Sequence, residues 1–283
     1  AQYAAPQGRI LLNPFKDVKV SSWFGKYVID LYNDGIINGT SATTYAPNDT
    51  LTWAAALKLL LVSHGDLKAA DATGADWSKN TIAKAAELGL VAADLDGAKA
   101  ISRLEFCQVA AKLNKLAESK TESKFTDCTD GYVMALVDAK VISGMTETTF
   151  EPTGKLTGFQ WAKMLLCAVG FGVKGEFTGS SWSVNTALVA HKVNLFAGDL
   201  DGADHTALRR EQAALYAFNV LTNVKKVAYS PNVTSYVYGI QGYTTVNGIG
   251  STLGQDVFGL TSNTGIIVKN EGIGANATYL SKD

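Results

Sequence analysis

The sequence is poor in the residues that build disulfide frameworks and transition-metal sites. Its 283 residues include three cysteines and three histidines. Cys107, Cys128 and Cys167 are odd in number, unevenly spaced and next to apolar stretches, which predicts buried free thiols. The histidines have no spacing that suits zinc, and no Ser/His/Asp or Cys/His order indicates a catalytic nucleophile. We therefore expect neither a metal site nor an enzyme active site.

The sequence also lacks an excess of charge and any long apolar run. Lysine plus arginine number 25 and aspartate plus glutamate 26, so no long-range field favours nucleic acid or an anionic membrane. No apolar run approaches the roughly 20 residues that span a bilayer, and phosphate-loop and dinucleotide-binding patterns are missing. We expect no nucleic-acid partner, no membrane insertion and no cofactor. The start of the chain, Ala1 to Pro6, suits the mature N-terminus of an exported protein.

An internal duplication is the most informative feature that is present. Residues 31–98 recur as residues 136–203, an offset of 105. An insertion then moves the offset to 106, so that Arg103 and Glu105 align with Arg209 and Glu211. Repeats of this kind indicate stacked modules that complete one another's cores, and such modules more often bind or assemble than catalyse. Matching positions include Gly39 and Gly144, Pro47 and Pro152, Lys58 and Lys163, and Trp77 and Trp182.

Apolar spacing divides each half again into two modules, each with a helix, a loop and a second helix. We predict module one over residues 14–66, module two over 76–117, module three over 124–171 and module four over 180–223, preceded by an N-terminal segment, 1–13. Modules one and two form the first pair (14–117) and modules three and four the second pair (124–223). Ser21 or Ser22 is expected to cap the first helix, which ends at Asp34-Gly35. The predicted fold is mainly α.

Helical periodicity stops after about Asn223, and Tyr, Val, Thr, Asn and Gly then dominate. Residues 233–238, 243–246 and 265–268 are predicted to be strands of a β-rich segment, 224–283. This segment either folds alone, packs on the helical modules, or lends strands to a neighbouring molecule.

Several motifs resemble the S-layer homology (SLH) domain. They include Phe15-x-Asp17-Val18, Gly35-Ile36-Ile37-Asn38-Gly39, Tyr45-x-Pro47-Asn48, Ser102-Arg103-Leu104-Glu105-Phe106 and Leu208-Arg209-Arg210-Glu211. The resemblance covers roughly residues 14–222. It implies four SLH-like modules and an exported bacterial protein attached to a peptidoglycan-linked cell-wall polysaccharide, often one bearing acidic ketal groups. It also implies that signature arginines and nearby loop residues hold the glycan in grooves between modules.

The motif Ser102-Arg103-Leu104-Glu105-Phe106, here called the signature, contains residues that cap a helix and an arginine that is a candidate for binding. Ser102-x-x-Glu105 and Thr157-x-x-Gln160 each fit a capping box, whereas an arginine in the first helical turn lies unfavourably against the helix dipole unless it meets an anion. Arg103, Arg209 and Arg210 are therefore candidate anion clamps, and salt bridges are the alternative for each. At the signature position, module one has Trp53 and module three has Gly158.

Acidic and aromatic residues supply the other candidates. Asp17 and Asp127 either accept glycan hydroxyls, in a composite site at the junction of paired modules, or are ordinary turn residues. Trp23, Trp77 and Trp182 recur near helix starts and suit either sugar stacking or core packing.

One acidic loop resembles a metal site. Asp94, Asp96 and Glu105 fall at EF-hand positions, but Lys99 stands where glycine is needed. A tight Asp-Gly turn is the better interpretation.

We conclude that this is a non-catalytic, extracellular surface protein that binds an anionic wall polysaccharide. The close alternative is a subunit that self-assembles into a surface layer or filament. A wall-acting enzyme with its catalytic domain beyond Asp283 is a third class.

Overall fold

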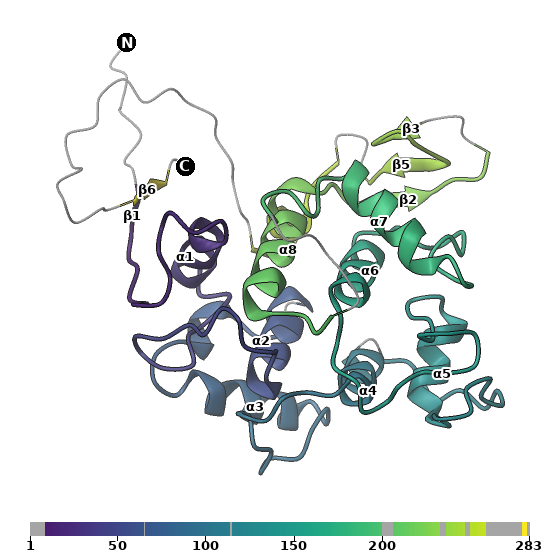
Figure 1. The fold of residues 1–283 in the computed structure, drawn as a ribbon, viewed down its shortest axis with the longest axis horizontal. Helices are drawn as coiled ribbons and strands as arrows, with labels where there is room; N and C mark the ends of the chain where they lie inside the picture. Colours follow the sequence, from purple (N-terminus) through teal and green to yellow (C-terminus); the bar gives the residue numbers. More distant parts are fainter. Residues whose placement is uncertain are drawn as a thin grey trace.

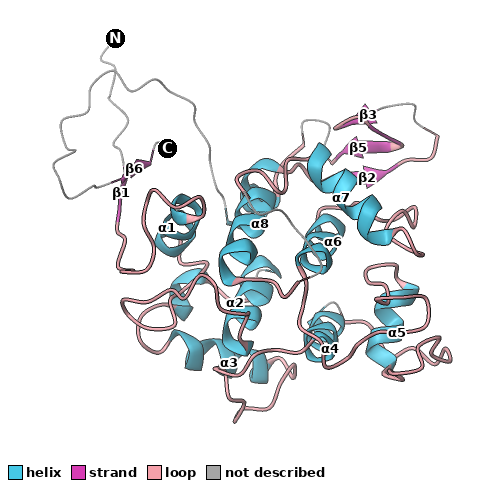
Figure 2. Cartoon of the chain, viewed as in Figure 1, coloured by secondary structure: helices cyan, strands magenta, loops and turns pink. Residues whose placement is uncertain are grey.

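The computed structural model describes residues 9–64, 66–113, 115–199, 206–232, 236–246, 250–258 and 279–281. Within them the chain is mainly α with short strands, as predicted (Figure 2). No described helix is both long and apolar enough to cross a membrane. The helices are α1 (Gly25–Asn33), α2 (Trp53–His64), η1 (Ala69–Ala72, 3₁₀), α3 (Trp77–Glu87), α4 (Arg103–Leu113), α5 (Gly131–Asp138), α6 (Gly158–Ala168), α7 (Trp182–Lys192), α8 (Arg210–Asn223) and α9 (Leu253–Phe258).

The helices alternate between an inner and an outer position. In Figure 1, α2, α4, α6 and α8 surround the middle of the molecule, and α1, α3, α5 and α7 lie further out. Each predicted module contributes one outer helix followed by one inner helix. The duplication in the sequence therefore corresponds to a repeated outer-inner pair.

Local capping chemistry explains where the inner helices begin. At α6 the Thr157 hydroxyl accepts from the Gln160 N–H, and Gln160 Oε1 accepts from the Thr157 N–H, which confirms the predicted capping box. At α4 the Ser102 N–H donates to Glu105 at 2.8 Å in the same way. The cap predicted for the first outer helix is wrong. Residue 22 takes part in tight turns, and α1 begins after Phe24 without a side-chain cap.

Within each pair the two modules join through backbone hydrogen bonds next to the inner helices. The Ile101 N–H donates to Leu51 O at 3.3 Å in the first pair, and the Leu208 N–H donates to Leu156 O at 2.7 Å in the second. Isolated β-bridges accompany them, between Thr52 and Ala100 and between Thr157 and Ala207. The two pairs thus use the same joint.

A second kind of joint links one pair to the other. The Arg103 N–H at the start of α4 donates to Gly154 O in module three at 2.8 Å. The Arg210 N–H at the start of α8 donates to Asp49 O in module one at 3.0 Å. Module two therefore contacts module three, and module four returns to module one. The four modules form a closed ring.

These joints correct the alignment of the two halves. Arg103 and Arg210 make the same contact, as do Ile101 and Leu208, so the offset here is 107 and not 106. The structural counterpart of Arg103 is Arg210, and Arg209 corresponds to Ser102. The sequence alignment paired Arg103 with the wrong residue because Arg209 and Arg210 are adjacent and either one fits the motif.

A single apolar core runs through modules one to four, and a smaller cluster lies around α5. Phe106 of α4 packs edge-on against Trp161 of α6, with ring centroids 5.9 Å apart. Trp53 on α2 and Trp161 on α6 are both buried. The modules therefore depend on one another for burial of their apolar side chains.

The C-terminal segment packs on the helical ring. The described strands pair in three antiparallel two-stranded sheets: β1 (Arg9–Leu11) of the N-terminal segment with β6 (Tyr279–Ser281), β2 (Val227–Tyr229) with β5 (Tyr243–Thr245), and β3 (Tyr236–Val237) with β4 (Ile240–Gln241). Tyr243 is fully buried against Phe171 of module three, with centroids 5.0 Å apart. Of the predicted strands, residues 233–235 and 265–268 lie outside the described residues. The helix α9 was not predicted.

Candidate functional site

Arg103 and Arg210 are buried between modules. Each side chain is 3% exposed. Arg103 donates to the carbonyls of Phe150 and Ser143, and its Cζ lies 4.2 Å from the Phe150 ring centroid. Arg210 donates to the carbonyls of Tyr45 and Asn38, and its Cζ lies 4.8 Å from the Tyr45 ring centroid. The two guanidinium groups therefore hold equivalent loops, one in each half.

Asp17 and Asp127 hold the same two loops from inside the module. Asp17 accepts from the Tyr45 and Ala46 N–H groups, and Asp127 accepts from those of Phe150 and Glu151 at 2.7 and 2.8 Å. The hydrogen bond from the Phe150 N–H holds the pKa of Asp127 below its ordinary value. An aspartate and an arginine thus meet at each loop.

The observed contact and the predicted composite site join different modules. Arg103 of module two meets the loop of Asp127 in module three, and Arg210 of module four meets the loop of Asp17 in module one. Each site therefore lies between the two pairs, not within one pair. The pairing could not be deduced from the sequence because it depends on closure of the ring.

Two buried lysines complete the arrangement, and sequence analysis did not select them. Lys58 Nζ donates to Asn38 Oδ1 and to Ala72 O, and lies 5.8 Å from the Trp77 ring centroid. Lys163 Nζ donates to Ser143 Oγ at 2.8 Å and to Phe177 O, and lies 5.7 Å from the Trp182 centroid. Their signal in the sequence was a lysine repeated within an apolar helical stripe.

Burial changes the proton affinity of both lysines. Lys58 is 1% exposed and Lys163 is 2% exposed. Desolvation lowers the pKa of Lys58 to about 7 and that of Lys163 to about 8, because burial disfavours the charged form. Both amines therefore titrate near neutral pH, where a nearby anion would favour the ammonium form.

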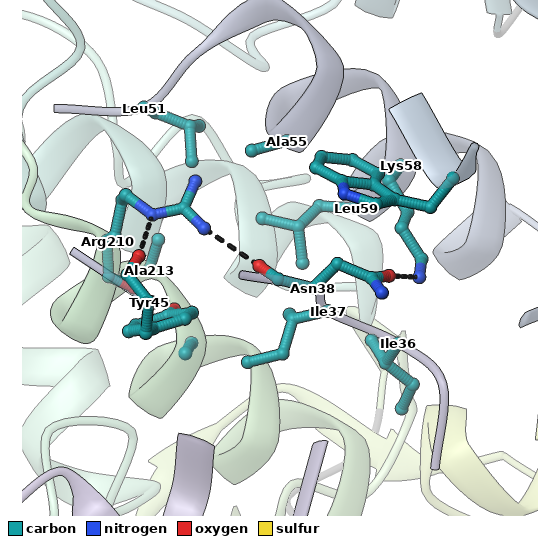
Figure 3. A pocket seen from close by; sticks show the side chains of 12 residues that line it. Ile36, Ile37, Asn38, Tyr45, Leu51, Ala55, Lys58, Leu59, Arg210 and Ala213 are labelled. Carbon is teal, nitrogen blue, oxygen red and sulfur yellow. Dashed lines mark hydrogen bonds between the residues drawn. The ribbon is translucent and has the colours of Figure 1, made fainter. Parts of the chain in front are cut away.

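Each lysine shares a small pocket with an arginine and a tryptophan. Asn38, Tyr45, Lys58, Trp77 and Arg210 line the first pocket, of about 20 Å³ (Figure 3). There, Arg210 and Lys58 approach Asn38 from opposite sides and bond its backbone and side-chain oxygens.

The second pocket, of about 10 Å³, repeats this plan in the other half. Arg103, Ser143, Gln160, Lys163 and Trp182 line it. Each of these volumes has room for roughly one water molecule or a group of similar size.

The charged side chains that line the two pockets are all lysines and arginines. Neither lining contains an aspartate or glutamate. Across the part of the chain that is described, none of the four cations forms an ion pair with a carboxylate. An isolated buried charge is costly, so the pockets are chemically suited to receive an anion.

The remaining candidates lie elsewhere. Arg209 Nε donates to Glu211 Oε1 at 2.7 Å, and half-buried Trp23 packs against Phe24 with centroids 5.4 Å apart. Neither residue lines the first or the second pocket. In the acidic loop, Asp96 accepts from the Ala98 N–H, as expected of a turn. The described residues contain no cluster of metal ligands.

All three cysteines are free and Cys107 and Cys128 are buried, as the sequence predicted, but Cys167 is only half-buried, in contrast to the prediction. Burial raises the pKa of Cys107 to about 12, so its thiol is neutral at physiological pH.

Comparison with known proteins identifies the repeated unit. The family model of the S-layer homology domain matches residues 14–56 and 126–162. These two segments of the chain are S-layer homology domains. The two matches fall in modules one and three, and membership of modules two and four in the same family stays a prediction. S-layer homology domains mediate attachment of surface proteins to the cell wall, and this chain is a cell-surface or cell-wall-associated protein.

The chain is also similar in sequence to two curated proteins. The chain is 38% identical over 84 residues to a surface-layer 125 kDa protein of Lysinibacillus sphaericus, covering 27% of this chain and 7% of that protein. It is 29% identical over 176 residues to an endoglucanase of Bacillus sp. (strain KSM-635), covering 54% of this chain and 18% of the enzyme. The chain thus spans less than a fifth of each relative. The S-layer homology match and the surface-layer relative point to an anchoring role for this region.

Proposed function

We propose that the chain attaches to an anionic cell-wall polysaccharide through the first and second pockets. One observation carries the proposal: an arginine, a buried lysine and a tryptophan recur together in both halves, without a carboxylate in either lining. Arginine has five N–H donors and lysine has three. The described contacts use two donors of each, which leaves three on each arginine and one on each lysine for a ligand.

The size of the pockets limits which part of the ligand enters. One oxygen atom of an anionic group such as a carboxylate fits each pocket, and a whole sugar ring does not. Trp77 is half-buried at the first pocket and offers an aromatic surface for the sugar that bears this group. An acidic ketal on a sugar supplies the required chemistry.

The other predicted contacts surround these pockets or lie apart from them. Asp17 and Asp127 are exposed, and their carboxylate oxygens have lone pairs beyond the loop bonds, so they stay predicted acceptors for glycan hydroxyls. Arg209 and Trp23 stay predictions for contacts outside the pockets.

A pull-down with purified cell walls tests the proposal. The chain should bind walls that retain the non-peptidoglycan polymer and lose binding after that polymer is extracted. It should also lose binding when the acidic groups of the polymer are removed by mild acid. Equal binding to extracted and intact walls would contradict a polysaccharide ligand.

Self-assembly into a surface layer is the second candidate, and α7 favours it. Val184 and Leu188 on α7 are 60% and 57% exposed, whereas the matching positions of α3 hold Lys79 and Ala83. An apolar strip on only one of two duplicated helices suits contact with another protein surface. Val184→Lys combined with Leu188→Ala should abolish any self-association seen by light scattering, and unchanged association would reject this surface.

A further inference from the structure

A third cavity lies in the middle of the ring and differs from both pockets in size and chemistry. Its volume is about 550 Å³. The inner helices of all four modules contribute to it, with Leu59 on α2, Leu113 on α4, Trp161 on α6 and Val220 on α8, and Leu253 of α9 adds to the lining. Figure 1 shows these four inner helices around the centre of the molecule.

A void of this size is unusual inside a protein. Packed cores rarely leave voids larger than a water molecule, and a cavity of about 150 Å³ is enough to hold a benzene ring. The central cavity is more than three times that volume. Its volume falls in the range of sites that hold small organic ligands, which is roughly 300–1,000 Å³.

The lining is apolar and uncharged. The indole N–H of Trp161 is already donated to Ala213 O at 3.3 Å. The other polar side-chain hydrogen in the lining belongs to the Cys167 thiol, and burial raises the pKa of this thiol to about 12, so it is neutral. A ligand with hydroxyl or charged groups would lose its hydrogen bonds with water and gain none from these side chains. The chemistry therefore excludes the glycan of the two small pockets.

The depth of the cavity restricts the shape of the ligand. Leu59, Leu113 and Val220 on its floor are at most 7% exposed. Ala139 and Ala168 also line the cavity but are exposed, which places an opening to solvent beside them. The rigid surface of another folded protein cannot reach such a floor through a local opening, whereas a thin flexible chain can. Met164 in the wall adds an adaptable side chain that can follow a flexible ligand.

We propose that the central cavity binds a hydrocarbon chain, of the class found in fatty acids and lipid tails, with the polar end of that molecule left at the opening. Each buried methylene would add favourable transfer free energy without requiring a polar partner. The cavity shares Leu59 with the first pocket and Met164 with the second, but it contains none of their charged side chains.

Fluorescence of N-phenyl-1-naphthylamine with the full chain tests this proposal. The probe should bind saturably at one site per chain, and dodecanoate should displace it. Ala139→Phe and Ala168→Phe add bulk at exposed lining positions, so each should weaken probe binding at least tenfold while leaving the helical circular dichroism unchanged. Ala83→Phe adds the same bulk at an exposed position of α3 outside the lining and should have no effect.

Thiol labelling supplies an independent readout. Cys167 lines the cavity and is half-buried, whereas Cys107 and Cys128 are buried outside it. Dodecanoate should slow alkylation of Cys167 at least tenfold and leave the other two thiols unaffected. The proposal would be overturned by the lack of saturable probe binding, by equal binding in all variants, or by a dimer in solution that excludes the probe. Wall binding is measured separately, so its failure would leave this result interpretable.

Discussion

The first and second pockets each contain one arginine and one lysine, but the aromatic residues around these cations differ. Arg210 packs on Tyr45, whose hydroxyl donates back to Arg210 O at 2.9 Å, whereas Arg103 packs on Phe150, which has no hydroxyl. Trp77 is half-buried, but its counterpart Trp182 is 4% exposed. The duplication has kept the arginine and the lysine of each pocket and has varied the groups around them.

The two pockets also differ in the joints that build them. Arg103 bonds carbonyls 40 and 47 residues further along the chain. Arg210 bonds carbonyls 172 and 165 residues earlier, and its joint closes the ring. The same kind of arginine contact thus joins consecutive modules at Arg103 and closes the ring of modules at Arg210. Variants that affect one pocket at a time separate these two roles.

The largest effect is expected from Arg210→Ala. It leaves the carbonyls of Tyr45 and Asn38 buried without their donor, at roughly 1–3 kcal/mol each, and removal of an unpaired charge offsets part of this. We expect a loss of about 3 kcal/mol in the free energy of unfolding, measured by urea denaturation. The control Arg209→Lys keeps a cation beside Glu211, whose side chain is 4% exposed, and should cost less than about 1 kcal/mol. A larger loss for Arg209→Lys than for Arg210→Ala would contradict the corrected alignment.

The next effect concerns binding. Lys58→Met together with Lys163→Met removes the ammonium groups from both pockets and keeps their volume nearly filled. Wall binding should weaken about a hundredfold, whereas stability should change little, because relief from burying an unpaired charge offsets the loss of the hydrogen bonds to Ala72 O and Phe177 O. Sedimentation with cell walls and urea denaturation measure the two quantities. Loss of stability in parallel with binding would show instead that the lysines are structural.

The pH dependence should distinguish the two lysines. Lys58 and Lys163 have pKa values lowered to about 7 and about 8, below the ordinary 10.5. A bound anion favours the charged amine, so each pocket loses affinity as the pH rises above its pKa, by at most about tenfold per unit. Binding to the Lys163→Met variant, which retains the first pocket, should therefore weaken at lower pH than binding to Lys58→Met. Coincident pH profiles would contradict this order.

Without ligand, the same shifts affect folding. The unfolded lysines bind more protons than the folded ones between about pH 7 and 10.5, so stability should rise with pH over that range. The double methionine variant should lack this rise when unfolding is measured from pH 7 to 10. An equal rise in both proteins would show that other groups cause it.

The smallest effect is expected from Tyr45→Phe, which makes the first pocket resemble the second. Loss of the hydrogen bond to Arg210 O should cost about 1 kcal/mol in unfolding free energy. Tyr236→Phe, at a side chain that is 64% exposed, is the matched control and should change nothing. No change in Tyr45→Phe would mean that its hydroxyl bonds equally well to water in the unfolded chain.

Local patterns in the sequence predicted much of this structure. Apolar spacing located the outer and inner helices, and Thr157 and Ser102 marked helix starts through short-range capping. The arginines and two of the tryptophans at the pockets were also selected. Local patterns could not show that Arg210 instead of Arg209 enters the joint, because that choice depends on a loop 165 residues away. Lys58 was overlooked because lysine is usually exposed, and its burial here depends on Asn38, Ala72 and Trp77 from separate segments.

Titration calorimetry with the purified wall polysaccharide tests the central claim most directly. We predict two binding sites per chain in the wild type, and one in each of Lys58→Met and Lys163→Met. Two sites in both single variants, or a single site in the wild type, would contradict the account of two equivalent anion pockets.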